Sequence, residues 1–370
     1  MDTRDGELPR TDAALRSEQV PKATVKAAQT FGIDNICTDR YVPLYDQPCL
    51  DLIFEWEDQI STAAGLPITS TRLYRKYHEN IIARKLYKLP GAHTFSNSVG
   101  QWFGRGRKSL YITLRPQGKG GFSTRSNVIP IIIDFWKLDD LKSFFKNYSH
   151  CPLVMVSSPE VFSYLKNSAC PLNLHCLPLS LPDKYRAVRD GSFNKQYDVV
   201  IAGRQNPVLM GYMERYAKER RDVEYLYQSM QGRNYTYISN KSGALGAYGT
   251  FNDRGAYWNL LKAAKVCFYS TQGMDGGDVR TGGFNPVTPR FLEILSAGCH
   301  VLARYPDNED TAFFGLKEIG PSIESYAEFV AQLEAALESP PPIHKNCEYL
   351  KKHYTSSRLA LLNQILSTCV

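Results

Sequence analysis

Residues 282–298 read GGFNPVTPRFLEILSAG, and this is the most informative stretch of the chain. Its leading glycines let the backbone approach a ligand closely. Thr288 followed by Pro289 is a typical helix start, with a capping residue and then proline at the first helical position. Apolar residues then recur on one face as far as Gly298, which ends the pattern. The stretch therefore predicts a helix over 288–297 whose N-terminus faces a ligand and whose other side packs on a core.

The polar residues of this helix suit a nucleotide. A helix N-terminus offers unpaired N–H groups and the positive end of the helix dipole, and both favour a diphosphate. Arg290 lies in the first turn, where a basic residue is disfavoured unless an anion is bound, and its guanidinium can hold phosphate oxygens. Glu293 lies on the same face, and its carboxylate could accept two ribose hydroxyls. The alternative is an exposed ion pair between Arg290 and Glu293.

Short apolar runs alternate with amphipathic segments along most of the chain, which is typical of parallel sheets covered by helices. Residues 178–195 lack a core pattern and are interpreted as an interdomain linker. We therefore expect an α/β fold with two facing Rossmann-like domains and ligands beyond the carboxyl ends of the strands. Expected strands are 49–54, 109–114, 128–133, 153–156, 174–177, 197–202, 223–227, 266–270 and 301–303. Expected helices are 71–87, 138–147, 161–166, 208–220, 253–264, 288–297, 325–337 and 347–366.

The helix of Arg290 and Glu293 resembles the signature of GT-B glycosyltransferases of the retaining group-1 type. It is most similar to their capsule, O-antigen and spore-coat relatives, in which a T-P-R-x-x-E-x-L-x-x-G run opens the same helix. The resemblance covers most of the C-terminal half. Residues 197–204 (YDVVIAGR) resemble the first strand of that domain and its Gly-Arg loop, and residues 254–270 (RGAYWNLLKAAKVCFYS) resemble the helix and strand before the donor loop. Residues 153–158 and 174–181 resemble the last two strands of the N-terminal domain.

The resemblance implies a two-domain enzyme. Residues 46–185 would form an acceptor-binding Rossmann-like domain and residues 195–340 a nucleotide-sugar-binding one. Residues 343–370 would form a helix that crosses back onto the N-terminal domain, and polar residues 1–45 are interpreted as a partly ordered leader. The implied reaction moves a sugar from a nucleoside-diphosphate sugar to an oligosaccharide or a polyprenyl-diphosphate-linked acceptor in surface polysaccharide synthesis. It would retain the configuration and need no metal and no cofactor.

The resemblance also assigns roles to residues. Arg204 and Arg290 would bind the diphosphate and Glu293 the ribose. The family has a second glutamate eight residues before Glu293, where this chain has Asn285. It also often has a lysine after the Gly-Arg pair, a charge that Arg280 could replace here. The expected donor-binding residues are Gly203, Arg204, Arg280, Gly282, Gly283, Asn285, Thr288, Arg290 and Glu293.

Two residues of the first half are candidates for the chemistry. Asp134 follows a very apolar strand, so we expect it at a strand's carboxyl end facing the cleft, where it could act as the base for the acceptor hydroxyl. The alternative role for Asp134 is a helix cap. His93 lies among small polar residues, and a histidine of the N-terminal domain often touches the donor sugar in this fold; the alternative is a plain loop histidine. Both would be candidate bases in an inverting enzyme of the same fold.

The net charge of the chain indicates which kinds of partner it can bind. Its 370 residues carry 44 basic and 37 acidic side chains, a formal net charge of +7. This excess fits an anionic substrate, an anionic membrane surface or nucleic acid. A basic run interleaved with aromatic residues could contact lipid head groups or a diphosphate-linked acceptor; the alternatives are nucleic acid and an ordinary solvated face. The run comprises Arg105, Arg107, Lys108, Arg115, Lys119 and Arg125, with Trp102, Phe103, Tyr111 and Phe122.

Other classes of protein fit less well. A Rossmann-type oxidoreductase needs a G-x-G-x-x-G run after an early strand, and none is found. A non-catalytic nucleic-acid-binding protein would explain the charge but not the Thr-Pro-Arg…Glu helix, so we expect no nucleic-acid partner. No apolar run approaches the roughly 20 residues of a membrane span, and the N-terminus lacks a signal-peptide pattern. The nine dispersed cysteines predict free thiols in a cytoplasmic protein, with peripheral contact at the inner face of the membrane as the alternative.

Overall fold

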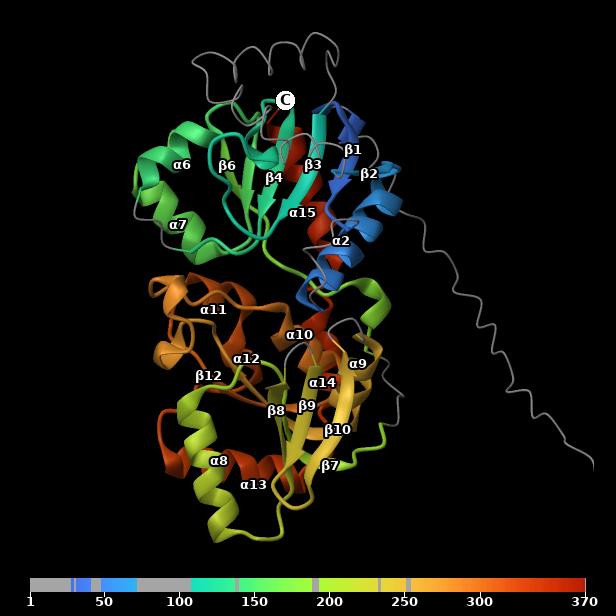
Figure 1. Ribbon diagram of the computed structural model, residues 1–370, viewed down its shortest axis with the longest axis vertical. Helices are drawn as coiled ribbons and strands as arrows, with labels where there is room; N and C mark the ends of the chain where they lie inside the picture. Colours follow the sequence, from blue (N-terminus) through green and yellow to red (C-terminus); the bar gives the residue numbers. More distant parts are fainter. Residues whose placement is uncertain are drawn as a thin grey trace, which may run out of the picture.

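The computed structural model describes residues 28–29, 31–40, 48–71, 108–136, 140–187, 193–231, 234–250 and 254–369. Two lobes lie one above the other along the long axis, each built on a six-stranded sheet with helices against its faces (Figure 1). The N-terminal lobe is uppermost in this view, and the C-terminal lobe lies below it. This is the expected α/β architecture of two facing Rossmann-like units.

The sheet of the N-terminal lobe is parallel throughout, in the order β2-β1-β3-β4-β5-β6. Its most apolar strand, β4, is buried along its whole length. Parallel pairing places the carboxyl ends of all six strands at one edge. The strands are β1 (Ile33–Thr38), β2 (Ile68–Ser70), β3 (Lys108–Thr113), β4 (Val128–Ile132), β5 (Val154–Val156) and β6 (Leu174–Cys176), and the helices are α2 (Pro48–Ala64), α6 (Leu141–Tyr148) and α7 (Pro159–Asn167).

Two expectations for this lobe were wrong. The strand expected at residues 49–54 is the start of helix α2, because Ile53, Trp56, Ile60 and Ala64 recur at helical spacing and all face the core. Strand β1 lies within residues 1–45, the expected leader, so the sheet begins earlier than the sequence indicated. The helix expected at residues 71–87 lies almost wholly outside the described residues.

The sheet of the C-terminal lobe has the order β10-β9-β8-β7-β11-β12. Strands β7, β8, β11 and β12 are parallel neighbours, while β8, β9 and β10 form an antiparallel meander. The sequence interpretation missed β9 and β10, and it missed α11 and α12. The strands are β7 (Tyr197–Ile201), β8 (Tyr225–Gln231), β9 (Asn234–Ser239), β10 (Gly243–Thr250), β11 (Ala264–Ser270) and β12 (His300–Arg304). The helices are α8 (Pro207–Glu219), α9 (Arg254–Ala263), α10 (Pro289–Ser296), α11 (Glu309–Phe314), α12 (Leu316–Ile319) and α13 (Tyr326–Glu338).

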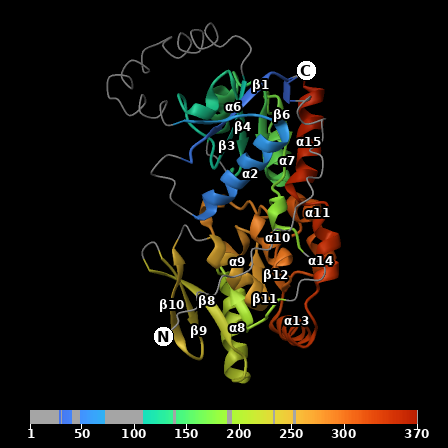
Figure 2. The same cartoon turned by 90° about the vertical axis from the view of Figure 1, so that its right-hand side faces the viewer.

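The C-terminal segment joins the two lobes. It forms two helices, α14 (Ile343–Leu350) and α15 (Thr355–Thr368), where the sequence predicted one over 347–366. Helix α14 buries Tyr349 in the core of the C-terminal lobe, while α15 buries Leu362 in the core of the N-terminal lobe. Figure 2 shows α15 running beside the upper lobe. The expected crossing of the last helix onto the N-terminal domain is confirmed.

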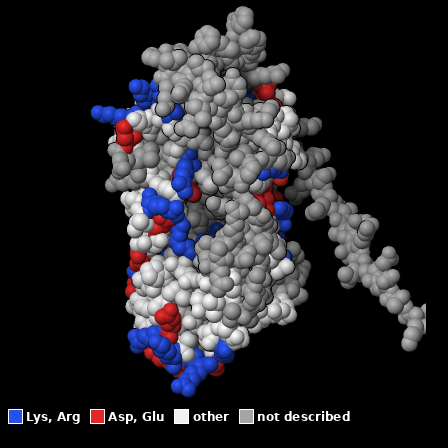
Figure 3. Space-filling view, in the orientation of Figure 1, with Lys and Arg blue, Asp and Glu red and all other residues white. Residues whose placement is uncertain are grey.

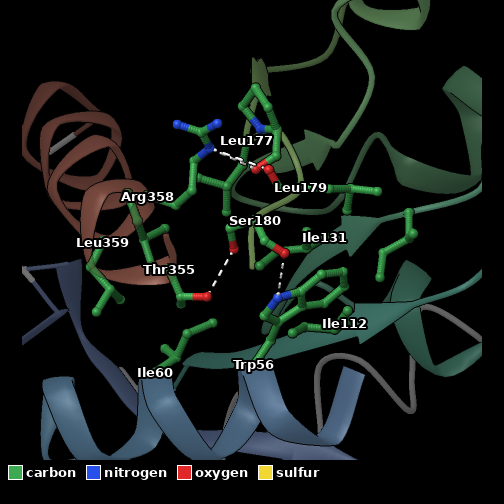
Figure 4. Close-up of a pocket in the computed structure, with 13 residues that line it drawn as sticks. Trp56, Ile60, Ile112, Ile131, Leu177, Leu179, Ser180, Thr355, Arg358 and Leu359 are labelled. Atoms are coloured by element: carbon green, nitrogen blue, oxygen red, sulfur yellow. Dashed lines mark hydrogen bonds between the residues drawn. The ribbon is translucent and has the colours of Figure 1, made fainter. Parts of the chain in front are cut away.

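A small apolar cavity of about 40 Å³ lies where α15 meets α2 and the strands β3 and β4 (Figure 4). Its rim is held by hydrogen bonds from Trp56 Nε1 to the carbonyl oxygen of Ser180 (3.2 Å) and between the hydroxyls of Ser180 and Thr355 (2.9 Å). A cavity of this size holds a water molecule or two rather than a nucleotide. The nucleotide expected from the sequence therefore does not fit this cavity.

Candidate functional site

The loops that follow β7 and β11 meet at the carboxyl edge of the C-terminal sheet. The two strands are parallel neighbours, so both chains leave the sheet at the same edge. Arg204, just after β7, donates to the carbonyl oxygen of Gln272 (3.4 Å) and to Oδ2 of Asp278 (3.2 Å). Both acceptors belong to the glycine-rich loop, residues 271–288, which leads from β11 into α10.

Arg290, in the first turn of α10, lies against the backbone of the Gly203-Arg204 turn. Its Nη1 donates to the carbonyl oxygen of Arg204 (3.2 Å). Gly203 has a φ of +73°, and a Cβ at that position would lie 2.7 Å from Cζ of Arg290. Glycine is therefore favoured at this position, both for the backbone conformation and for the guanidinium that rests on it.

The guanidinium groups of this edge outnumber the carboxylates that neutralise them. Arg280 binds both oxygens of Asp278, at 2.8 and 2.7 Å, and this hydrogen bonding lowers the pKa of Asp278 to about 2. Burial lowers the pKa of Arg204, and the charge of Arg290 lowers it further. Within the described residues Arg290 forms no ion pair. An anion of high charge, such as a diphosphate, would balance these charges.

Asp134 from the N-terminal lobe faces the same cluster. It directly follows the apolar β4 segment, and its amide donates to the carbonyl oxygen of Leu114 (2.7 Å). Burial raises the pKa of Asp134 to about 6, although the positive charges of Arg115, Arg204 and Arg280 act to lower it. A carboxylate that titrates near neutral pH in a cleft can accept a proton from a hydroxyl group.

Trp136 links the two lobes next to Asp134. The guanidinium carbon of Arg115 lies 4.2 Å from the centre of the Trp136 ring, and that of Arg280 lies 4.7 Å from it. Such cation–π contacts join an arginine of each lobe through one aromatic side chain. The space-filling view shows a hollow between the lobes with Lys and Arg side chains beside it (Figure 3).

Glu293 is buried, with 4% of the residue exposed, and its partners are not those expected from spacing. Its Oε1 accepts from Arg254 Nη2 (2.6 Å), and its Oε2 accepts from the hydroxyl of Tyr257 (2.9 Å). Burial raises the pKa of Tyr257 well above its usual value, and the charge of Glu293 raises it further. The ion pair considered between Arg290 and Glu293 is absent from the described contacts. Sequence reasoning missed Arg254, whose position at a helix start is the same unusual signal that singled out Arg290.

Two backbone amides just before α10 donate hydrogen bonds to side chains. The amide of Thr288 donates to the hydroxyl of Tyr269 (3.0 Å), and that of Val287 donates to Oδ1 of Asp310 (3.1 Å). Thr288 precedes the helix as expected, but its side chain makes no capping hydrogen bond. These two amides are thus not available to an anion.

Asn285 lies where the family resemblance would place a glutamate. Its Oδ1 accepts from the hydroxyl of Thr271 (2.9 Å), and its Nδ2 donates to the carbonyl oxygen of Gly283 (2.9 Å). Gly282 and Gly283 both have positive φ values, +63° and +99°, which shape the turn before Asn285. The Asn285 side chain therefore stabilises its own loop.

Carboxylates of α7 and α11 hold this loop from the junction of the lobes. Glu160 Oε2 accepts from the amide of Asn285 (2.7 Å). Asp310 Oδ2 accepts from the hydroxyl of Ser158 (2.5 Å) and the amide of Glu160 (2.8 Å), at the N-terminus of α7. Burial raises the pKa of Asp310 to about 6. The loop is thus anchored to both lobes.

Several expected residues lie outside the described part of the chain, namely His93, Trp102, Phe103, Arg105 and Arg107. Of the rest of the basic run, Lys108 donates to the carbonyl oxygen of Phe31 (2.8 Å), so it is tied to its own lobe. Among the described residues, no group of three His, Cys, Asp or Glu side chains is arranged to hold a metal ion. No helix in the described ranges has both the length and the apolar character that a membrane crossing requires.

No model of a known protein family matches the chain, and no curated protein matches it. Among solved structures the chain is similar to a GtfA/B complex, with 10% identity over 75% of this chain and 60% of that one and a TM-score of 0.45. It is also similar to a mutant of S. aureus TarM bound to fondaparinux, alpha-GlcNAc-glycerol and UDP, with 10% identity, coverage of 74% and 59%, and a TM-score of 0.45. The chain thus spans about 60% of the length of these two proteins. A third similar structure is a UDP-forming α,α-trehalose-phosphate synthase from Burkholderia xenovorans, with 8% identity over 86% of each chain and a TM-score of 0.45.

Proposed function

We propose that this protein is a glycosyltransferase that moves a sugar from a nucleoside-diphosphate sugar to a saccharide acceptor. One observation carries the proposal: Arg290 lies over Gly203 and donates to the carbonyl oxygen of Arg204, and the buried carboxylate of Glu293 follows on the same helix. The two guanidinium groups would bind the diphosphate, and Glu293 would accept hydrogen bonds from the ribose hydroxyls. The positions resembling the GT-B signature support the same assignment.

The cationic cluster suits the chemistry of this reaction. Breaking the bond between sugar and diphosphate leaves negative charge on the departing nucleotide. Preorganised guanidinium groups stabilise that charge as it develops, which is usually the largest contribution to such catalysis. Arg204, Arg290 and Arg280 could provide this stabilisation without a metal ion.

The acceptor would enter from the N-terminal lobe. Arg115 of that lobe lies against Trp136, and Asp134 faces the arginine cluster, which supports a hydroxyl acceptor that also carries negative charge. A polyprenyl-diphosphate-linked saccharide fits this description, while an oligosaccharide fits the hydroxyl group alone; the family resemblance supports a role in surface polysaccharide synthesis for either acceptor. The polyprenyl-linked acceptor would bring the protein to the inner face of the membrane.

The stereochemical course has two candidates. The family resemblance implies retention of configuration. Inversion is favoured by Asp134, a half-buried carboxylate with a pKa of about 6 beside the cationic cluster, because an inverting enzyme needs a base for the acceptor hydroxyl. Proton NMR of the first-formed product decides between them through the anomeric coupling constant. Asp134→Asn should lower kcat by about 10²–10⁴-fold only if the enzyme inverts.

Ligand-induced stabilisation tests the whole proposal. We expect one of UDP, GDP, CDP and dTDP to raise the melting temperature without added metal, because a ligand that binds only the folded state stabilises it. Glu293→Ala and Arg290→Gln should each remove that shift. Arg215→Gln is the matched control, since Arg215 pairs with Glu219 on the exposed face of α8. Absence of a shift with every diphosphate, or a shift with NAD alone, would contradict the proposal.

A further inference from the structure

The carboxylate of Glu293 is connected to the N-terminal lobe through one arginine. Arg254, the first residue of α9, donates from Nη2 to Glu293 (2.6 Å), and its Nε lies 3.1 Å from Oε1 of Glu55. Glu55 belongs to α2 of the N-terminal lobe. Nε of Arg254 also lies 3.0 Å from the hydroxyl of Tyr185, in the segment between the lobes. A Glu–Arg–Glu chain therefore runs from the proposed ribose site across the junction.

This chain of charges is shielded from water. The side chains of Glu293, Arg254 and Glu55 are only 6%, 13% and 12% exposed. The Tyr185 hydroxyl donates to Glu55 Oε1 (2.6 Å), and its ring stacks on Trp258 at 4.3 Å between centroids. Lys184 also binds Oε1 of Glu55 (2.9 Å). These contacts fix the guanidinium between two carboxylates rather than leaving it to swing freely.

Sharing the guanidinium affects what Glu293 can bind. Burial disfavours the charged form of Arg254, but the carboxylates of Glu293 and Glu55 raise its pKa above the usual value. While Glu55 holds part of that positive charge, Glu293 keeps more capacity to accept hydrogen bonds from a ligand. If the lobes separate, Glu55 leaves and the full charge of Arg254 falls on Glu293. Ribose binding by Glu293 would thus be stronger while Glu55 contacts Arg254 and weaker after the N-terminal lobe has moved away.

We propose that Arg254 and Glu55 are positioning residues that couple ribose recognition by Glu293 to the seating of the N-terminal lobe. This inference rests on the proposed function, since it takes Glu293 as the ribose ligand. By linkage, a nucleotide that binds through its ribose favours the arrangement in which Glu55 contacts Arg254. Through this relay, formed by Glu293, Arg254 and Glu55, binding of the donor would stabilise the seated position of the acceptor-binding lobe.

The test compares a ribonucleotide with its 2′,3′-dideoxy analogue by isothermal titration calorimetry. The probe is the nucleoside diphosphate that stabilises the wild type. The readout is the ribose preference, defined as the dissociation constant of the dideoxy analogue divided by that of the ribonucleotide. Glu55→Gln keeps the shape of the side chain and should reduce this ratio about fivefold or more. Arg254→Lys keeps the positive charge but loses the fork that spans both carboxylates, and it should reduce the ratio similarly.

Arg40→Gln is the control. Arg40 binds the carbonyl oxygen of Phe54 (2.9 Å) and Asp58 (2.8 Å) on the same helix α2 without touching Arg254, so the ratio should stay at the wild-type value. An unchanged ratio in folded Glu55→Gln, or an equal loss in Arg40→Gln, would overturn the relay alone. A wild type that binds the diphosphate without ribose preference would also overturn it. A wild type that binds none of the nucleoside diphosphates would overturn the proposed function, and the relay with it.

Discussion

Replacing Gly203 by alanine should separate the role of Arg290 in binding from the cost of the backbone conformation. Gly203 has a φ of +73°, and in this region an L-residue costs about 1–2 kcal/mol. The new Cβ would lie 2.7 Å from Cζ and Nη2 of Arg290. Carbon atoms normally approach no closer than about 3.5 Å. The guanidinium must therefore move by roughly 1 Å, because the long arginine side chain yields more easily than the backbone.

The expected consequences differ for stability and for binding. Unfolding in urea should show a loss of about 1–2 kcal/mol, close to the backbone cost alone. Binding of the nucleoside diphosphate should weaken about tenfold to a hundredfold, since a hydrogen bond to a charged group contributes about 1.5–3 kcal/mol. Isothermal titration calorimetry on the purified variant measures this second effect directly.

Gly243→Ala provides the matched control. Gly243 has a φ of +76° at the start of β10, and nothing lies within 4 Å of the Cβ it would gain. This variant should lose the same stability as Gly203→Ala and bind the nucleotide like the wild type. Equal nucleotide affinity in the two variants would refute the reasoning that Arg290 contacts the diphosphate.

Three further predictions concern Asp134, Asp310 and helix α15. Asp134→Asn should lower kcat about 10²–10⁴-fold if Asp134 is the base, and wild-type activity should then fall as pH drops below about 6, where Asp134 takes up its proton; a wild-type pH profile in the variant would contradict this role. The folded-state pKa of Asp310 is raised from 3.8 to about 6, so ionised Asp310 opposes folding, and the free energy of unfolding should fall by about 2 kcal/mol as pH rises from 4 to 6. Asp310→Asn should flatten this slope in urea titrations, and an unchanged slope would assign it to other groups. Leu362→Ala should cost about 2–5 kcal/mol in thermal or urea unfolding, because Leu362 is buried in the core of the N-terminal lobe; a loss below about 1 kcal/mol would mean that α15 contributes little to that core.

Local sequence patterns predicted most helices and strands, because the start of a helix and the burial of a strand depend on residues that are adjacent in the sequence. Ser158 caps α7 as the Ser-Pro-Glu start indicated, and its hydroxyl accepts from the amide of Val161. The apolar run that became β4 is buried along its length. The strand expected at 49–54 failed because a six-residue window is too short to distinguish a strand from one face of a longer helix. The prediction of one continuous helix over 347–366 failed for a different reason. The chain breaks at Tyr354, which forms a β-bridge with Leu181 in the segment between the lobes.

The sequence by itself determined the local features of the site. It indicated the turn at Gly203, the first-turn arginine of α10 and the carboxylate at Glu293, because glycine conformations and helix starts are set by a few adjacent residues. Only the tertiary structure decided the partners of these groups. Glu293 meets Arg254 rather than Arg290, and Asp134 comes from the other lobe to face Arg204 and Arg280. These pairings join segments far apart in the chain, so they follow from how the two lobes pack and from which charges that packing buries together.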